Sequence, residues 1–232
     1  MVERGIEHQS PAQVELKEAR GTRILLSMFD VIQAATGQSD RECFNQLVRF
    51  WADCLRVYPM PDADHEVADR LMPWTESFID ECMDRKADFF GEVLLRRGCY
   101  GEETSLLLPS EASVRDANDA MMNALPNDES RWQTVFDPRA GTGRFLADLA
   151  VRYPGRNLVL FGAEPDLDLY RACLVNMRLY AWTRPCFIVW ADSTTMDVGP
   201  RSPNWLYANL CNPPQVPYQS RSLQVCLSRN AE

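Results

Sequence analysis

Short apolar runs alternate with helical stripes after residue 130, and this alternation constrains the fold more than any other feature of the sequence. The runs are rich in β-branched and aromatic residues and cover 134–136, 158–161, 187–190 and 205–210. Helical periodicity over 144–153 and 166–180 separates the first three of them. An order of strand, helix, strand, helix, strand is typical of a parallel sheet with right-handed crossovers. We therefore predict an α/β fold for this part of the chain.

The residues before this point show helical periodicity only. Apolar residues recur at spacings of three and four, and stretches with Gly, Pro or Asp separate one helix from the next. The predicted helices cover 24–35, 41–57, 62–72, 74–97 and 109–125. Ser39 or Asp40 is placed to cap the second of them. We expect a helical region over residues 1–125 and an α/β domain over residues 126–232.

The composition is that of a folded chain, with 46% hydrophobic and 25% charged residues in a length of 232. No apolar run reaches the ~18–20 residues that span a bilayer, and the first residues contain no apolar signal segment. We therefore expect a cytoplasmic protein without membrane contact. The eight cysteines include no C-x-x-C pair, which predicts reduced thiols and no metal site.

Charge is distributed unevenly along the chain. Residues 1–130 hold 25 acidic and 13 basic residues, whereas residues 131–232 hold 8 and 11. A nucleic acid would have to bind the second half, because the acidic first half repels a polyanion. The cations are almost all arginine, which suits phosphate, although a biased genomic base composition explains this equally well. The acidic half is either a solvated helical surface or a charged mimic of DNA.

A glycine-containing loop, Asp137-Pro-Arg-Ala-Gly-Thr-Gly-Arg-Phe145, joins the first apolar run to the helix that follows it. Its glycines allow a tight turn and a close approach to a ligand, and the helix N-terminus offers free amides. Glu164 lies 21 residues after Gly143 at the end of the second run, where nucleoside binders keep an acid for the ribose hydroxyls. Because the loop has two glycines and no lysine, it fits a nucleoside better than a pyrophosphate. The alternative is a plain strand–helix turn with a surface acid.

The fourth run leads into Asn212-Pro-Pro-Gln215. At the tip of a parallel strand, such a rigid turn can hold the Asn212 amide and nearby carbonyls at a set angle. These oxygens can accept hydrogen bonds from an exocyclic amino group and hold its nitrogen in line with an electrophilic methyl group, which is catalysis by positioning. Asn-Pro-Pro alone is often only a turn, but here it follows a glycine loop and a ribose acid in order.

These motifs together resemble those of the S-adenosylmethionine-dependent amino-methyltransferases, chiefly the adenine-N6 DNA methyltransferases. The similarity is greatest to the modification subunits of type I restriction systems and to their plasmid and phage relatives. The glycine loop is similar to the family's first motif, Phe161-Gly-Ala-Glu164 to its second, Ala191-Asp192-Ser193 to its third and Asn212-Pro-Pro-Gln215 to its catalytic fourth. Asp88-Phe-Phe-Gly91 and residues 101–121 resemble the helical lead-in, so that the resemblance covers roughly residues 86–215.

The resemblance implies a Rossmann-like methyltransferase parallel sheet, incomplete at about four strands, with S-adenosyl-L-methionine as the cofactor. The positions that match the family's cofactor contacts are Asp137, Pro138, Ala140, Gly141, Thr142, Gly143, Phe145, Glu164 at the ribose, Asp192 at the adenine, and Pro109 and Ser110 near the methionine carboxylate. The positions that match its catalytic motif are Asn212, Pro213, Pro214 and Gln215. The implied partner is DNA, from which the target base would be extruded.

Three departures from the family leave alternatives open. Gln215 stands where the family usually has Tyr or Phe, and Leu108-Pro109 stands where it has Thr-Pro. The sequence ends 17 residues after Gln215, where the family's sheet continues with three more strands and often a target-recognition domain. The alternatives to adenine-N6 methylation are a weakened, methyltransferase-like binding or antirestriction protein that keeps the cofactor pocket, and methylation of protein glutamine or RNA amino groups. A protein partner would then supply the missing strands or the specificity.

Overall fold

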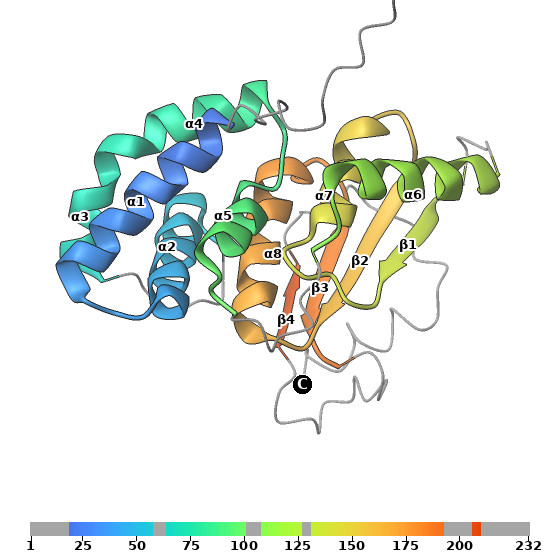
Figure 1. Ribbon diagram of the computed structural model, residues 1–232. Coiled ribbons are helices and arrows are strands. Elements are labelled where there is room, and N and C mark those ends of the chain that lie inside the picture. Colours follow the sequence, from blue (N-terminus) through green and yellow to red (C-terminus); the bar gives the residue numbers. More distant parts are fainter. Residues whose placement is uncertain (1–18, 58–63, 101–107, 127–130, 193–205, 210–232) are drawn as a thin grey trace, which may run out of the picture.

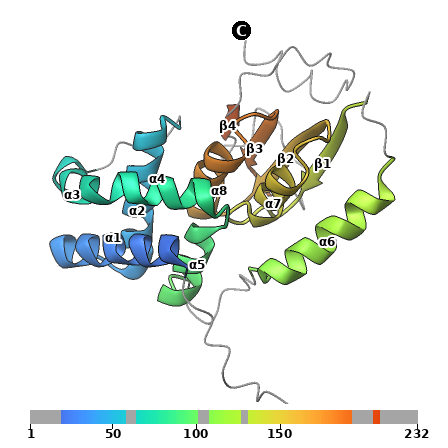
Figure 2. The same ribbon diagram turned by 90° about the horizontal axis from the view of Figure 1, so that it is seen from above.

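The computed structural model (Figure 1) describes residues 19–57, 64–100, 108–126 and 131–192, and the backbone of residues 206–209. Within these residues, a helical body lies beside a sheet that is flanked by further helices (Figures 1 and 2). The change from helices to strands falls at residues 127–130, which are outside the described ranges. The domain boundary near residue 125 therefore stays a prediction.

The helical body consists of α1 (Arg20–Thr36), α2 (Asp40–Leu55), α3 (His65–Leu71), a 3-10 turn (Met72–Trp74), α4 (Thr75–Asp84) and α5 (Phe89–Arg97). The apolar stripes of these helices meet in one core, where the rings of Trp51 and Phe78 lie 4.5 Å apart. Ser39 is the residue that caps α2, in a capping box with Glu42. Burial of these stripes, rather than helix propensity alone, is what stabilises helices of this length.

The single helix predicted over residues 74–97 is wrong, because the chain breaks between α4 and α5. Arg85 is extended, and the helix starts again at Phe89. Asp88 caps the new helix by accepting a hydrogen bond of 2.9 Å from the amide of Gly91. The apolar spacing continues across the break, so periodicity alone does not reveal it.

Three parallel strands form the predicted α/β arrangement. They are β1 (Gln133–Asp137), β2 (Leu158–Glu164) and β3 (Cys186–Trp190). The crossovers between them are α7 (Arg144–Arg152) and α8 (Leu167–Tyr180). Strand β2 lies between the other two, and all seven of its residues except Phe161 are buried. A strand whose side chains are buried in both directions is typical of a sheet that is covered on both faces.

The fourth strand, β4 (Leu206–Asn209), runs opposite to the direction we expected. It pairs with β3 in antiparallel register, with Leu206 opposite Trp190 and Asn209 opposite Phe187. The sheet order is therefore β1-β2-β3-β4. A parallel neighbour needs a crossover connection, usually a helix, and residues 191–205 contain three prolines or glycines and no helical apolar stripe. The four-strand sheet is confirmed, but only its first three strands are parallel.

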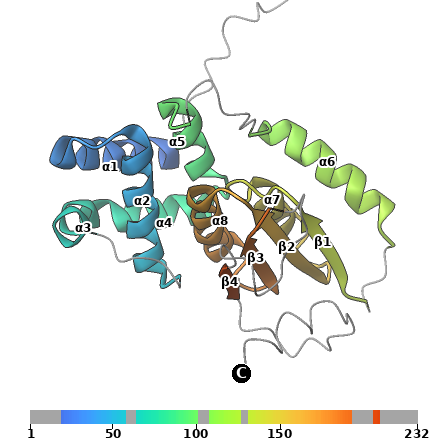
Figure 3. The same cartoon turned by 90° about the horizontal axis from the view of Figure 1, so that it is seen from below.

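Helix α6 (Glu111–Ala124) lies along α7, apart from the helical body (Figures 2 and 3). Several polar contacts join the two helices. The Asn118 amide donates to the Phe145 carbonyl at 3.1 Å and to Asp148 at 2.7 Å. Arg152 and Tyr153 both bond to Asp119 from the α7 side. Helix α6 is thus attached to the α/β layer through these polar groups and through the buried side chains of Val114 and Met122.

The composition led to expectations about cysteines, membrane spans and metal sites, which the described residues address. Six cysteines lie in it, all of them free thiols and all buried except Cys54. Cys211 and Cys226 lie outside it. None of the described helices has both the length and the apolar character needed to cross a membrane. Nor do His, Cys, Asp or Glu side chains gather in threes there in a way that would hold a metal ion.

A buried carboxylate joins the helical body to the α/β layer. Asp88, at the start of α5, accepts hydrogen bonds from Thr142 at 2.5 Å, Arg144 at 3.0 Å and Asn176 at 2.7 Å. The exposed fraction of its side chain is only 1%. A charge buried this deeply is stable only when it is paired and hydrogen-bonded, so these four residues have to stay together.

We predict that Gly91→Ala destabilises the protein because Gly91 leaves the space that this carboxylate occupies. A Cβ atom at Gly91 would overlap the Asp88 carboxylate and lie 2.8 Å from the Arg144 guanidinium. Overpacking of this kind costs about 1–3 kcal/mol, more than alanine returns in helix propensity. Urea unfolding should show the loss. Gly155→Ala is the control, because a Cβ there meets nothing within 4 Å. Equal stability of the two variants would contradict the packing described.

Candidate functional site

The carboxyl ends of the parallel strands bring three acidic residues to one edge of the sheet. Asp137 ends β1 opposite Gly162, and Glu164 ends β2 opposite Trp190. Asp192 follows β3 two residues after Trp190, and the Ala191 amide donates to the Glu164 carbonyl at 3.2 Å. The structure therefore places the predicted ribose and adenine acids on the same edge, beside the glycine loop.

The glycine loop turns tightly between β1 and α7. Its path is set by two backbone hydrogen bonds, from Ala140 to the carbonyl of Ala163 at 3.0 Å and from Gly143 to the carbonyl of Ala140 at 2.7 Å. Gly141 and Gly143 have φ angles of 55° and 85°, in the left-handed region that glycine adopts without cost. A Cβ at Gly143 would lie 2.8 Å from the Cys173 sulfur of α8, so this glycine also permits close packing.

Glu164 is buried and held by two backbone amides. Its Oε2 accepts from Gly141 at 2.8 Å, and its Oε1 accepts from Asp166 at 2.9 Å. Burial raises the pKa of Glu164, and these two hydrogen bonds act in the opposite direction. Each carboxylate oxygen has a second lone pair, so the group can still accept two more hydrogen bonds.

The other two acids differ in their surroundings. Asp137 is half-buried and accepts a hydrogen bond of 3.1 Å from the Arg139 amide. Burial raises the pKa of its carboxyl group as well. Asp192 is exposed, at the end of the described segment. Two partly desolvated carboxyls and one exposed acid therefore line this edge.

Some residues predicted to contact a cofactor turn their side chains elsewhere. Thr142 is fully buried, and its hydroxyl donates to Asp88 rather than into the edge. Phe145 packs against the core from α7. Pro138 is exposed in the turn after β1. Thr142 can thus serve a ligand only through its backbone, while its side chain anchors the loop to the helical body.

The lead-in segment does reach the glycine loop. The Pro109 carbonyl accepts a hydrogen bond of 2.8 Å from Arg144, the first residue of α7. The Leu108 side chain lies 3.5 Å from where a Cβ of Gly141 would be. Ser110 is exposed and caps α6 by accepting from the Ser113 amide at 3.1 Å. The structure therefore brings Leu108 and Pro109, but not the Ser110 hydroxyl, against the loop.

The predicted catalytic residues Asn212, Pro213, Pro214 and Gln215 lie outside the described residues. Strand β4, which precedes them, ends with Asn209 opposite Phe187, near the start of β3. Its carboxyl end therefore points to the edge of the sheet opposite Glu164. The catalytic assignment stays a prediction.

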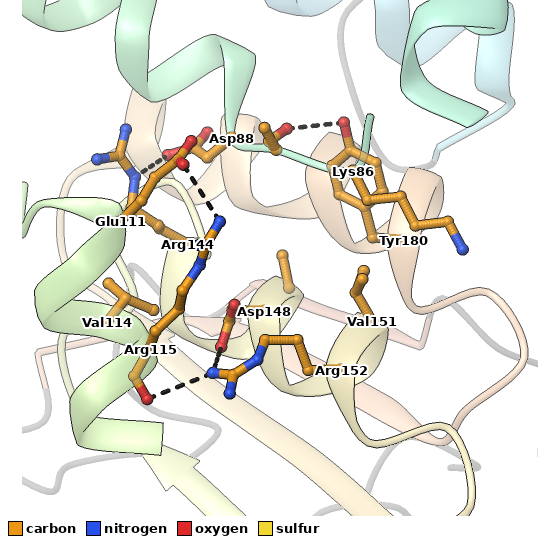
Figure 4. A pocket seen from close by; sticks show the side chains of 12 residues that line it. Lys86, Asp88, Glu111, Val114, Arg115, Arg144, Asp148, Val151, Arg152 and Tyr180 are labelled. Carbon is orange, nitrogen blue, oxygen red and sulfur yellow. Dashed lines mark hydrogen bonds and ion pairs between the residues drawn. The ribbon is translucent and has the colours of Figure 1, made fainter. Parts of the chain in front are cut away.

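A cavity of about 400 Å³ lies between α6, α7 and the link that precedes α5 (Figure 4). Val114, Ala147 and Val151 contribute apolar surface, and Lys86 reaches it from the link. The remaining charged side chains around it are mostly engaged with one another, as Arg152 is with Asp148 at 3.3 Å. None of the predicted site residues lines this cavity, so it is separate from the acidic edge.

Several residues that shape the edge were not singled out by sequence reasoning. Arg144 contacts Asp88, Glu92 at 2.9 Å and the Pro109 carbonyl, and so ties α5 and the lead-in to α7. Arg41 and Tyr100 bond to Asp166, two residues after Glu164. Asp88 was named only within the lead-in motif, although Asp is among the residues that commonly cap helices. The arginine contacts join segments far apart in the sequence.

Comparison with known proteins supports the fold. The sequence matches no protein-family profile and no curated protein. Among solved structures, it is similar to that of a Listeria monocytogenes protein assigned by inference to the class I S-adenosylmethionine-dependent methyltransferases. The TM-score is 0.55 at 12% sequence identity, and the match covers 76% of this chain and 55% of that one. The predicted α/β methyltransferase-like fold with a partial sheet is thus confirmed, and the chain spans about half the length of this neighbour.

We predict that Glu164→Gln changes how stability depends on pH. Because burial raises the folded-state pKa of Glu164 above its ordinary value of 4.5, the unfolded chain loses this proton at a lower pH than the folded chain does. The wild type therefore loses stability as the pH rises from about 4.5, and the non-titrating variant does not share this loss. In urea unfolding, the free energy of unfolding of the wild type minus that of the variant should fall as the pH rises from about 4.5. A difference that rises with pH would contradict the described environment; Glu66→Gln, at an exposed site on α3, is the matched control.

Proposed function

We propose that this chain binds S-adenosylmethionine at the carboxyl edge of β1–β3 and directs its methyl group to an exocyclic amino nitrogen, most simply N6 of adenine in DNA. The observation that carries the proposal is the Glu164 carboxylate. It lies at the end of β2, bonded to the Gly141 amide, in a fold similar to that of a class I methyltransferase. An acid at this position of an open α/β sheet suits the hydroxyls of a ribose.

The residues at the edge fit such a cofactor. Glu164 keeps acceptor capacity for both ribose hydroxyls after its two amide contacts. Asp192 is exposed beyond β3, where it could accept from an adenine amino group. The left-handed Gly141 and Gly143 bring the loop backbone close to the edge without a side chain in the way.

The charges at the edge also fit. The cofactor supplies an electrophilic methyl group on a positively charged sulfonium. Burial raises the pKa of both Asp137 and Glu164, which means that their ionised forms are poorly solvated. A nearby cation favours the ionised forms, so a positively charged nucleoside would stabilise these carboxylates more than a neutral one.

For the transfer itself, the family resemblance points to Asn212 and Pro213. The amide oxygen of Asn212 and the Pro213 carbonyl would accept the two hydrogens of the target amino group and hold its lone pair towards the methyl group. Gln215 would follow them where an aromatic ring is usual. DNA is the proposed substrate, and a protein partner that completes the sheet or reads the sequence is part of the same proposal.

A second candidate is a binding or antirestriction protein that keeps the cofactor site without catalysis. The orientation of β4 supports it, because the carboxyl end of this strand points away from Glu164. The excess of acidic residues in the first half of the chain is compatible with a surface that resembles DNA. Cofactor binding is common to both candidates, and methyl transfer distinguishes them.

We predict that wild-type protein binds S-adenosylmethionine with micromolar affinity in titration calorimetry, and that Glu164→Gln weakens this binding about tenfold or more. The loss follows because the substitution removes a charged acceptor, whose hydrogen bonds contribute about 1.5–3 kcal/mol each. Glu66→Gln, on the exposed face of α3, should bind like the wild type. Absence of binding by the wild type at millimolar cofactor would end the proposal.

Methyl transfer is tested with labelled S-adenosylmethionine and unmethylated duplex DNA. The enzyme hypothesis expects incorporation by the wild type and a loss of about 100-fold or more in Asn212→Ala, since positioning contributes several kcal/mol to such reactions. Equal incorporation by the two proteins would exclude Asn212 from catalysis. Cofactor binding without any incorporation would favour the binding or antirestriction candidate.

A further inference from the structure

Several hydrogen bonds hold the turn after β2, and one of the residues that form them, Arg41, belongs to the helical body. It consists of Glu164, Pro165 and Asp166, where Asp166 is the N-cap of α8. We propose that Arg41 and Tyr100 are positioning residues that hold this turn, and through it the carboxylate of Glu164, in the geometry that receives the ribose of the cofactor. The inference rests on the proposed function for its ligand, but the geometry stands without it.

The Asp166 side chain is the point at which the helical body contacts the turn. Arg41 Nη2 donates to Asp166 Oδ2 at 2.9 Å, and the Tyr100 hydroxyl donates to Asp166 Oδ1 at 2.9 Å. The same Oδ1 accepts from the amides of Asp168 at 2.9 Å and Leu169 at 3.1 Å. The first turn of α8 is therefore joined to α2 and to Tyr100, three residues after the end of α5.

Arg41 makes this contact with two nitrogens at once. Its Nε donates to Asp168 Oδ2 at 2.9 Å while its Nη2 bonds to Asp166. Its guanidinium lies 4.8 Å above the centre of the Tyr100 ring. This use of the planar fork fixes both position and orientation, which a lysine ammonium cannot do.

Asp166 is linked to Glu164 directly, with only Pro165 between them in the chain. The Asp166 amide donates to Glu164 Oε1 at 2.9 Å. Pro165, between them, has a ring that restricts φ, and its carbonyl accepts the Trp190 indole N–H at 2.8 Å. Because the path is short and stiff, a displacement of Asp166 moves the donor that orients the Glu164 carboxylate.

The ion pairs of Arg41 contribute little to the stability of the fold. The exposed fraction of its side chain is 49%, and ion pairs at such exposure contribute little to folding. Helices α2 and α8 are also joined without it, since Arg178 donates to the Leu55 carbonyl at 3.2 Å and the buried faces of both helices share one core. The specific consequence of the Arg41 contact is the geometry of the turn.

The test compares Arg41→Gln with the conservative Arg41→Lys, with Tyr100→Phe, and with Arg70→Gln as the control. Arg70 forms an exposed ion pair on α3 that is remote from the turn.

Two quantities are measured: amide hydrogen exchange at Asp166 and Gly141 by NMR without ligand, and the Kd for S-adenosylmethionine. We expect Arg41→Gln to accelerate exchange at Asp166 and to weaken binding, each about fivefold or more, with the global unfolding midpoint near that of the wild type. Arg41→Lys and Tyr100→Phe should show smaller changes in the same direction, and Arg70→Gln none.

The two measurements separate this inference from the proposed function. If Arg41→Gln has the same exchange rate at Asp166 and the same affinity for S-adenosylmethionine as the wild type, the positioning role is overturned and the cofactor site is unaffected. If the wild type binds no cofactor, the proposed function fails, and the exchange measurement still decides whether Arg41 holds the turn. Should Arg41→Gln prove unstable, Tyr100→Phe, which removes one hydroxyl only, decides in the same way.

Discussion

The hydrogen-bonded carboxylate of Asp88 is the interaction on which the rest of this structure depends. It is almost fully buried and accepts from the Thr142 hydroxyl, the Arg144 guanidinium and the Asn176 amide, which come from the glycine loop, α7 and α8. A buried charge is tolerated only if its partners are in place, so losing any of these partners while the helical body and the α/β layer stay packed would leave a buried carboxylate without compensation. The glycine loop is thus shaped by the helical body as well as by the strand and helix that it joins.

The acidic edge of the sheet is supported at two further points. Arg144 extends the Asp88 network to the Pro109 carbonyl, which sets the lead-in against the loop. Arg41 and Tyr100 act on the opposite side of the edge, at the N-cap of α8. Glu164 lies between these supports and is bonded to one amide from each side, those of Gly141 and Asp166. The affinity of a ligand for Glu164 would therefore depend on how the helical body packs at both of these points.

Local patterns of the sequence predicted much of this arrangement and failed at identifiable places. The alternation after residue 130 predicted β1 to β3 with α7 and α8, and the position of Glu164 predicted an acid beside the glycine loop, where it accepts from the Gly141 amide. The break at residues 85–88 was missed, because the apolar spacing continues across it and the partners of Asp88 lie up to 88 residues away. The direction of β4 was also missed, since an apolar run does not reveal which side of which strand it will join.

The sequence by itself determined the periodicities, the left-handed glycine turn and the place of an acid at the end of β2, because each depends on residues that are near one another along the chain. The tertiary structure alone decided which carboxylates are buried, which arginines pair with them and which strand the fourth strand joins. The pairing of Arg41 with Asp166 spans 125 residues, and that of Arg144 with Asp88 spans 56. Such contacts arise from the packing of whole elements, and that packing is set by the shared core rather than by any local pattern.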